Sequence, residues 1–349
     1  MNPAAQRLAK LRQTMREHNL AAWIIPSADP HLSEYLPEHW QARVYFSGFT
    51  GSVGTLVVTA GKAGLWADSR YWEQAAHQLQ GSGIELQKVG EVAPYTDWLA
   101  AELPNGAAAG AAADMLSLTA KRQLETAFAA KNIRLDVSRD IADAVWAGRP
   151  ALPQETVFPH DAAFVSETAA AKLARVRAAM KEQGAAWHLI SSLDDTAWLT
   201  NLRGSDVPYN PVFLSYLLIG TDSAVLFVDE AKLNPASCAL LAEAGIATAP
   251  YAAVREALAE ISDGLLVNPD KTAVSTLQLM PSENRLIENI NPSTLFKSVK
   301  SAADLDHVRE AMRQDGAALC GFFAEFERNL ADGAAMNELD IDTMLHKYR

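Results

Sequence analysis

The spacing of apolar residues predicts the same pair of structural elements twice along the chain. In residues 7–27 and again in residues 172–192, apolar positions recur every three or four residues, and an extended apolar stretch follows. The two segments coincide at one offset, for example at Met15 and Met180, and after a one-residue slip the tripeptide AAW repeats. Each copy therefore predicts an amphipathic helix followed by a core strand.

The elements that follow each copy also keep the same order. After the first copy, two strands are predicted at residues 54–59 and 64–67, joined by the turn TAGK. Asp68 then stands where it can cap a helix from about Ser69. After the second copy, two apolar strands are joined by the turn GTDS and followed by DEAKL. The shared order indicates two tandem domains of one α/β fold.

The remaining segments complete the predicted domain organisation. Residues 145–159 are punctuated by proline and predict a linker, and the alanine-rich residues 100–115 are expected to form a helix end and a loop. A long amphipathic helix begins at Ser301 or Ala302 and a second helix follows, but no strands accompany them. We expect domains at residues 1–157, 158–298 and 299–349, the last being the incomplete beginning of a third domain.

Composition narrows the class of protein. The chain has 349 residues, and 49% of them are apolar, which is enough for sizeable cores. The formal net charge of -12 argues against nucleic acid or an anionic membrane as the main partner. The N-terminus lacks a secretory signal, and the two cysteines, Cys238 and Cys320, lie far apart, which argues against a disulfide framework. We expect a cytoplasmic protein.

The sequence offers no motif for a metal site. The eight histidines form none of the spacings H-x-H, H-x-x-x-H or H-E-x-x-H. Two pairs of carboxylates are close in sequence, but no histidine stands beside them, and we expect them to cap helices or lie on solvated faces. These pairs are Asp194 with Asp195 and Asp340 with Asp342.

Two polar stretches are candidates for function. In LWADSRY a strand delivers Asp68 and Arg70 at its end, beside Tyr71, where α/β folds often place functional groups. A helix cap with a surface ion pair explains the same residues equally well. In NLRGSDVPYNP the polar side chains either bind a ligand or bond to their own backbone in a long loop, and the sequence favours the second. They are Asn201, Arg203, Asp206 and Asn210.

Several stretches resemble the cytosolic type of aminopeptidase P, the three-domain Xaa-Pro aminopeptidases of the creatinase/prolidase-like metallopeptidase family. The matching pieces occur in family order and span almost the whole chain. They are IIPSADPHLSEY, RVYFSGFTGSVGT, LWADSRYWEQA, WAGRPALP, WLTNLRGSDVPYNPVFLSY and VKSAADLDHVREAMRQDGAALC.

The resemblance implies two tandem creatinase-type N-terminal domains, each a mixed sheet flanked by helices, and the first helices of a pita-bread catalytic domain from about Val299. Enzymes of this family release the N-terminal residue from peptides with proline in second position, using two divalent metal ions, commonly manganese, and they are expected to be homodimers. The family's Asp, His and Glu ligands match no position here. The chain alone is therefore expected to bind no metal and to be inactive. The alternative is a metal-free peptide-binding or regulatory relative.

The resemblance also implies a role for one residue. The arginine of the family's D-G-R-Y motif, which reaches the substrate site from the first domain, matches Arg70, and Ser69 replaces the glycine. A guanidinium suits a peptide carbonyl or carboxylate through forked hydrogen bonds. Asp68 and Tyr71 would support it. Asn201 and Arg203 are expected to shape the interface with the catalytic domain rather than to take part in the reaction.

Overall fold

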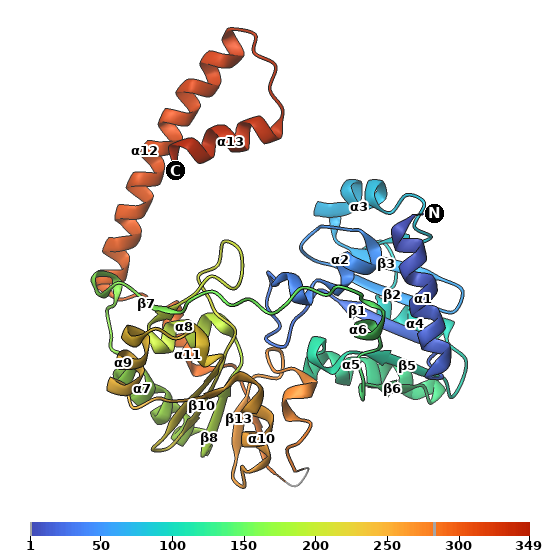
Figure 1. The fold of residues 1–349 in the computed structure, drawn as a ribbon, viewed down its shortest axis with the longest axis horizontal. Helices are drawn as coiled ribbons and strands as arrows, with labels where there is room; N and C mark the ends of the chain where they lie inside the picture. Colours follow the sequence, from blue (N-terminus) through green and yellow to red (C-terminus); the bar gives the residue numbers. More distant parts are fainter. Residues whose placement is uncertain (1, 282–283) are drawn as a thin grey trace. The chain divides into compact units, whose positions relative to one another are not determined.

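The computed structural model describes residues 2–281 and 284–349 of the chain. It divides into two compact units. Unit 1 contains residues 1–159 and 168–295, and unit 2 contains residues 160–167 and 296–349. Unit 1 holds both copies of the repeat, and unit 2 holds the two C-terminal helices (Figure 1).

The first half of unit 1 is built on a six-stranded mixed sheet with the order β4-β3-β2-β1-β5-β6. Strand β2 pairs antiparallel with β1 and β3, whereas β3–β4, β1–β5 and β5–β6 are parallel. The strands are β1 (Ala22–Pro26), β2 (Thr55–Thr59), β3 (Ala63–Ala67), β4 (Glu85–Lys88), β5 (Ala108–Ala111) and β6 (Arg134–Asp136).

The second half of unit 1 repeats this sheet in the order β12-β11-β10-β8-β13-β14. Each strand has the neighbours and directions of its counterpart, so the predicted duplication of an α/β fold is confirmed. The strands are β8 (Trp187–Ile190), β10 (Tyr216–Gly220), β11 (Ala224–Val228), β12 (Ala247–Pro250), β13 (Leu265–Val267) and β14 (Leu286–Glu288).

Helices cover both faces of the first sheet (Figure 1). One face packs against α1 (Pro3–Glu17), α2 (Ala42–Ser47), α3 (Trp72–Gln78) and α6 (Ile141–Val145), and the other against α4 (Tyr95–Glu102) and α5 (Leu118–Phe128). The apolar periodicity of α1 buries Leu8, Leu11 and Met15, and the Asn2 side chain caps its first turn.

The second sheet is covered in the same way. Helix α10 (Val254–Ala259) packs on one face, where Leu258 and Val267 are fully buried. Helices α7 (Ala169–Glu182) and α8 (Leu193–Thr200) contact β10, and α9 (Pro235–Glu243) and α11 (Pro292–Ser298) complete this half.

The prediction for the alanine-rich stretch was wrong in one respect. Residues 108–111 form β5, a fully buried strand between β1 and β6, instead of a loop. Small residues are required there because Trp23 of β1 pairs with Gly110, and a Cβ on Gly110 would lie 2.4 Å from the Trp23 ring. Alanine and glycine disfavour strands in general, so packing against one large neighbour overrides their intrinsic preference.

Two further predictions differ from the structure in the second half of unit 1. The stretch NLRGSDVPYNP, predicted to be a long loop, starts at the residue that ends helix α8 and includes β9 (Leu202–Arg203). Strand β9 pairs with β7 (Phe158–Pro159), so the stretch is not wholly a loop. The Asp195 carboxylate is buried and accepts hydrogen bonds from Ser192 Oγ, Asn291 Nδ2 and Thr294 Oγ1, whereas a cap or a solvated position had been expected.

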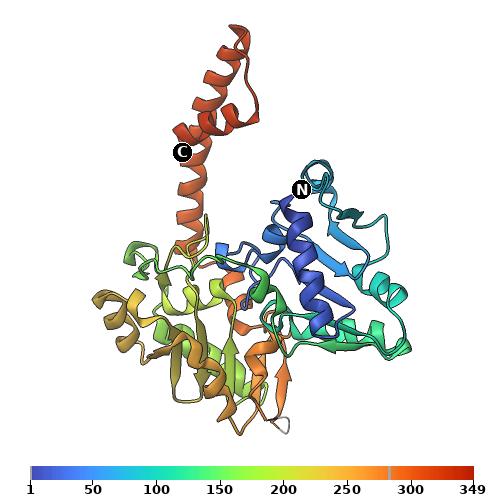
Figure 2. The same cartoon turned by 45° about the vertical axis from the view of Figure 1, so that its right-hand side comes forward.

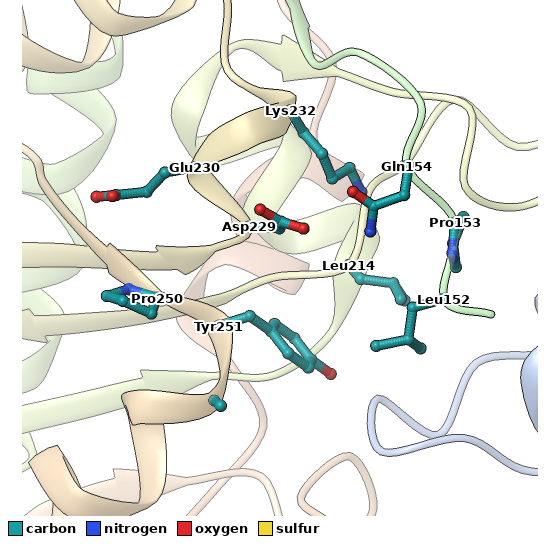
Figure 3. Close-up of a pocket in the computed structure, with 10 residues that line it drawn as sticks. Leu152, Pro153, Gln154, Leu214, Asp229, Glu230, Lys232, Pro250 and Tyr251 are labelled. Carbon is teal, nitrogen blue, oxygen red and sulfur yellow. The ribbon is translucent and has the colours of Figure 1, made fainter.

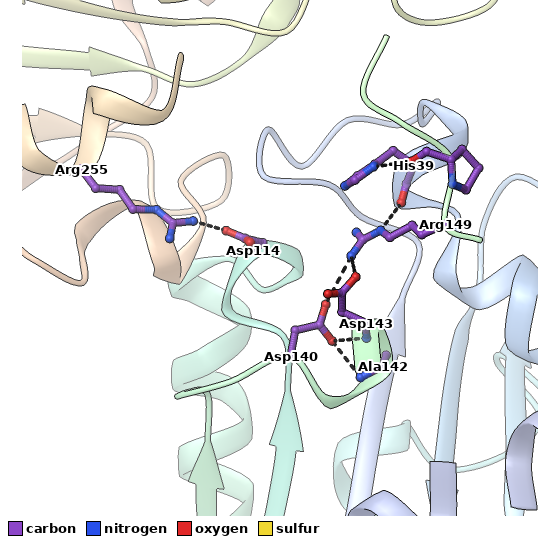
Figure 4. A network of polar contacts seen from close by, with 8 residues as sticks. His39, Asp114, Asp140, Ala142, Asp143, Arg149 and Arg255 are labelled. Carbon is purple, nitrogen blue, oxygen red and sulfur yellow. Dashed lines mark hydrogen bonds and ion pairs between the residues drawn. The ribbon is translucent and has the colours of Figure 1, made fainter. Parts of the chain in front are cut away.

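Contacts between the two halves of unit 1 centre on a buried histidine. His31 Nδ1 lies 2.8 Å from the carbonyl oxygen of Ser191, and His31 Nε2 lies 2.8 Å from the hydroxyl of Tyr251. Because a carbonyl only accepts, Nδ1 carries the proton and Nε2 accepts from the tyrosine. Arg255 also pairs with Asp114 of the first half (Figure 4).

Unit 2 consists mainly of a helical hairpin (Figure 2). Helix α12 (Ala302–Ala331) begins at Ala302, as predicted, and Ser301 and Asp304 form a capping box at its start. Helix α13 (Glu338–Tyr348) folds back along it. Several large apolar side chains of this hairpin are exposed, including Val308, Met312 and Phe323. None of the helices in the described part of the chain has the length and apolar character needed to span a bilayer.

The buried His188 of β8 predicts a pH-dependent stability. Its Nδ1 donates to the Leu266 carbonyl at 2.9 Å, and desolvation lowers its pKa to about 4, although Asp195 opposes the shift. The unfolded chain takes up this proton below about pH 6.5, so stability falls as pH drops towards 4, by about 3 kcal/mol in total. Burial lowers the pKa of His31 as well, with the same sign.

Urea unfolding at pH 7 and pH 5 measures this effect. Replacing His188→Asn keeps a donor for Leu266 but removes the titration. We expect the loss of stability between pH 7 and pH 5 to shrink by about 2 kcal/mol in the variant. An unchanged pH dependence would show that His188 is not buried in its neutral form.

Candidate functional site

The site is built on the end of β3, where Asp68 and Arg70 form a closed pair. The Asp68 side chain caps the short 3-10 helix η2 (Ser69–Tyr71) by accepting from the Arg70 backbone N–H at 3.0 Å. Its two carboxylate oxygens also accept from Arg70 Nε at 3.0 Å and Nη2 at 2.9 Å. The structure thus shows the cap and the surface ion pair that the second interpretation of LWADSRY predicted, with the guanidinium held by a forked bond, and a functional role of Arg70 stays a prediction.

The guanidinium of Arg70 is open to solvent, with 63% of its side chain exposed. The pair with Asp68 raises the pKa of Arg70 and lowers that of Asp68, so both groups stay charged. The Arg70 guanidinium carbon lies 5.2 Å from the centre of the Tyr71 ring, and the Tyr71 hydroxyl is 2.7 Å from Ser52 Oγ. An exposed, oriented guanidinium of this kind can donate hydrogen bonds to a carbonyl or carboxylate of a ligand.

A cavity of about 280 Å³ lies beside this pair. Ser52, the partner of Tyr71, lines it, as does Glu34, whose charge acts on Arg70. Much of the wall is aromatic or apolar. The lining includes Pro26, Tyr35, Leu36, Trp40 and Val44 of the first half of unit 1, with Pro208 and Tyr209 of the second half.

Arg43 lines the same cavity and carries a buried positive charge. Its guanidinium donates to Ser27 Oγ and to the carbonyls of Phe49 and Gly51, and it stacks on the Phe49 ring. No carboxylate in the described part of the chain pairs with it, and desolvation lowers its pKa to about 10. The three bonds use three of its five N–H groups, and the charge favours electron-rich ligand atoms nearby.

A second polar network holds the wall of the cavity in place. Arg149 donates from Nε to the His39 carbonyl and from Nη1 to Asp143, and it pairs with Asp140 at 3.7 Å (Figure 4). Its guanidinium carbon also lies 4.8 Å from the centre of the Trp40 ring. This arginine therefore fastens the start of the linker to the first half of unit 1 beside the cavity.

The two candidate residues of the second half have structural contacts. Asn201 ends helix α8 in the left-handed conformation, with φ +55°, and its Oδ1 accepts from the buried Lys172 Nζ at 2.6 Å. Arg203 Nη1 donates to the carbonyls of Ala197 and Leu202, and burial lowers its pKa. Neither residue lines the cavity beside Arg70, and their predicted support of an interface remains a prediction.

The contacts of Asn201 predict a graded effect on stability. Asn201→Ala should lower the free energy of unfolding by about 2–3 kcal/mol, because it adds strain in the left-handed region and leaves the buried Lys172 Nζ without the Asn201 acceptor, although Nζ keeps its bond to the Trp198 carbonyl. Asn201→Gly removes only the acceptor and should cost less. Thermal unfolding of both variants checks this order. Unchanged stability together with lost activity in the longest product of the gene would contradict the structural role.

A second cavity, of about 370 Å³, lies at the corresponding strand end of the second half (Figure 3). There Asp229 follows β11 and caps the 3-10 helix η6 (Glu230–Lys232), as Asp68 follows β3. The residue that corresponds to Arg70 is Ala231, which has no polar side chain. The duplicated fold therefore carries its exposed arginine in the first copy only.

The structure also bears on whether these residues could hold a metal ion. Among residues 2–281 and 284–349, no group of three or more His, Cys, Asp and Glu side chains is arranged to hold a metal ion. The donor set needed for a metal site is thus not formed by these residues, and no metal-dependent step is assigned to them.

Known proteins match the whole chain. Residues 7–143 and residues 148–304 each match a family model described as the creatinase/prolidase N-terminal domain. The crystal structure of an X-prolyl aminopeptidase from Caenorhabditis elegans, described as a cytosolic enzyme with a di-nuclear active site, superposes with a TM-score of 0.93. Its sequence is 27% identical, and the match covers 99% of this chain and 59% of that one.

Curated relatives agree with this structure. The "Probable Xaa-Pro aminopeptidase P" of Coccidioides posadasii is 35% identical over 99% of this chain, and that of Laccaria bicolor is 33% identical over the same share. The chain belongs to the Xaa-Pro aminopeptidase P family. It spans 55% of the length of each of these two relatives.

Sequence reasoning located one part of the candidate site and missed another. It singled out Asp68, Arg70 and Tyr71, which the structure brings together. It did not single out Tyr35, Arg43 or the rest of the cavity wall, because these residues come from separate elements, with Tyr35 in a loop and Arg43 in helix α2. His31 was recognised only as lacking a metal motif, although it bonds the two halves of unit 1.

Proposed function

We propose that this chain is the substrate-orienting and assembly portion of a metal-dependent aminopeptidase that releases the N-terminal residue from Xaa-Pro peptides. The matches of 99% of the chain to Xaa-Pro aminopeptidases support the activity. The exposed, forked Arg70–Asp68 pair is the observation that carries the orienting role. Arg70 would bind a carbonyl or carboxylate of the peptide, while Asp68 holds the guanidinium in position.

We also propose the metal ions, domain boundaries, location and oligomeric state of the whole enzyme. The two divalent ions, commonly manganese in the enzymes that the chain resembles, would activate water for attack on the peptide bond and would be held by residues outside this chain. The boundaries at residues 157 and 298, a start of the catalytic domain at 299, a cytoplasmic location and a homodimer belong to the same proposal. The exposed apolar residues of α12 favour a further packing partner for residues 299–349.

Hydrolysis of Xaa-Pro tripeptides with added Mn²⁺ tests this function. The 349-residue chain and the longest product of the gene are assayed side by side. We expect hydrolysis by the longer product alone. Hydrolysis by the 349-residue chain would contradict the assignment of the metal ligands. Failure of both proteins would favour the alternative, a metal-free peptide-binding relative.

A further inference from the structure

The cavity beside Arg70 has features of a peptide subsite. Its volume of about 280 Å³ is at the small end of ligand pockets, about 300–1,000 Å³, so it suits one or two side chains rather than a folded partner. Tyr35 and Tyr209 line it and remain 52% and 108% exposed. Grooves lined by aromatic side chains bind extended, proline-containing peptides because such peptides lose little entropy on binding.

Tyr209 has an unfavourable backbone conformation. Its φ is +62°, a conformation that costs a tyrosine on the order of 1 kcal/mol or more. Its ring has no ring contact, and its hydroxyl no hydrogen bond, with any residue that the structure describes. The loop around it is closed by bonds from the Asp206 N–H to the Val212 carbonyl and from the Asn210 N–H to the Val207 carbonyl.

The base of this loop is anchored in the core. The Asp206 carboxylate is buried, accepts from the Leu214 N–H at 2.6 Å and forms an ion pair with the buried Lys232. The anchor fixes the loop that presents Pro208 and Tyr209 to the cavity. An aromatic side chain that is displayed by a strained loop and satisfied by no contact within the protein suits contact with a ligand.

Two residues of the cavity wall connect it to the Arg70 site. Ser52 of the cavity wall lies 2.7 Å from the hydroxyl of Tyr71, which neighbours Arg70 in sequence and in space. Glu34 lines the cavity and also acts on the charge of Arg70. A peptide bound at Arg70 would reach the cavity past Ser52 and Glu34.

From these observations we infer that the cavity between Tyr35 and Tyr209 binds an apolar side chain or proline ring that follows the Xaa-Pro unit of a peptide. This inference rests on the proposed function. It adds a preference for apolar residues after the proline, carried by Tyr35, Trp40 and Tyr209. The buried charge of Arg43 would favour peptide carbonyls at the wall.

Binding of two peptide amides to the 349-residue chain tests the inference. Ala-Pro-Pro-Phe amide and Ala-Pro-Gly-Gly amide share the Xaa-Pro unit and differ only in what would enter the cavity. Their dissociation constants are measured by ligand-observed NMR. We expect the first peptide to bind about fivefold to tenfold more tightly.

Variants show where this preference arises. Tyr35→Ala and Tyr209→Gly should each reduce the ratio of the two dissociation constants, and the double variant should bring it below about two. The glycine also removes the backbone strain, so the loop should stay folded. Phe158→Ala is the matched control, because Phe158 is 43% exposed and does not line the cavity. It should keep the full ratio.

The outcomes separate this inference from the proposed function. Equal affinities in the native chain, or a ratio that survives the double variant, would overturn the subsite. A chain that forms a dimer, shows no preference between the peptides and becomes monomeric on Tyr209→Gly would also overturn the subsite. The cavity would then be an interface between two copies of the chain. Arg70→Ala should weaken the binding of both peptides equally. If it changes the binding of neither peptide, the role of Arg70 is contradicted and the subsite is not. No binding of either peptide at about 10 mM would overturn both.

Discussion

Gly110→Val is expected to destabilise unit 1 by at least about 3 kcal/mol. An added Cβ would lie 2.4 Å from Trp23 Cζ3 and 3.1 Å from Leu20 Cδ1, and both neighbours are buried. The backbone has little room to move, because β5 is hydrogen-bonded on one side to Trp23 of β1 and on the other to Asp136 of β6. Urea unfolding measures the loss.

Two comparisons establish the cause. Gly61→Val changes a glycine that has no atom within 4 Å of its added Cβ, and it should change stability by less than about 1 kcal/mol. Adding Trp23→Leu to Gly110→Val should restore at least about 1 kcal/mol of the free energy of unfolding, because the smaller leucine leaves room for the valine side chain. If the second change only adds to the loss, contact with the Trp23 ring does not explain the glycine.

Lys232→Met should lower the free energy of unfolding by about 3–5 kcal/mol, because it leaves the buried Asp206 carboxylate without its counter-ion. The two side chains are 2% and 0% exposed, so water cannot replace the lost partner. The loop that carries Tyr209 is anchored by this pair, and the variant should also lose the preference for Ala-Pro-Pro-Phe amide. Denaturant unfolding and peptide binding measure the two effects.

The double variant Lys232→Met with Asp206→Asn tests whether the pair is the cause. The asparagine Oδ1 can still accept from the Leu214 N–H, and no unpaired charge remains. We expect the double variant to be more stable than the sum of the single losses predicts, by at least about 2 kcal/mol. Strictly additive losses would mean that the two charges do not stabilise each other.

The repeated order of elements made the fold predictable. A strand whose position depends on packing against one large, distant residue could not be predicted from the sequence. The helix, strand and turn pattern of residues 7–67 recurs after residue 172, and the two sheets have the same order. Strand β5 was missed because four small residues carry no strand pattern of their own. Its position depends on Trp23, which is remote in sequence.

Only those residues of the candidate site that are close together in sequence could be predicted. Asp68 and Arg70 are two residues apart, so the cap and the ion pair follow from sequence. The cavity wall joins Tyr35 to Tyr209, and only the folded contact of the two halves of unit 1 brings them together. The buried Asp195 was likewise missed, because its donors Asn291 and Thr294 come from a distant segment.

The duplication suggests a division of roles between the copies. The first copy has kept an exposed arginine at the end of β3, and the second has Ala231 at the corresponding place. In the second copy, Lys232 points instead to the buried Asp206 and supports the loop of Tyr209. We interpret the second copy as a support for the ligand-facing surface of the first.

The specificity constant of Arg70→Ala tests the central claim most directly. It is measured on Ala-Pro-Ala with Mn²⁺ in the longest product of the gene, with Arg134→Ala as the matched control. Arg134 is 62% exposed and pairs with Asp136 two residues away, as Arg70 does with Asp68. We predict that kcat/KM falls at least about tenfold for Arg70→Ala alone, at unchanged stability. Equal kcat/KM values for the two variants and the native enzyme would contradict the orienting role of Arg70.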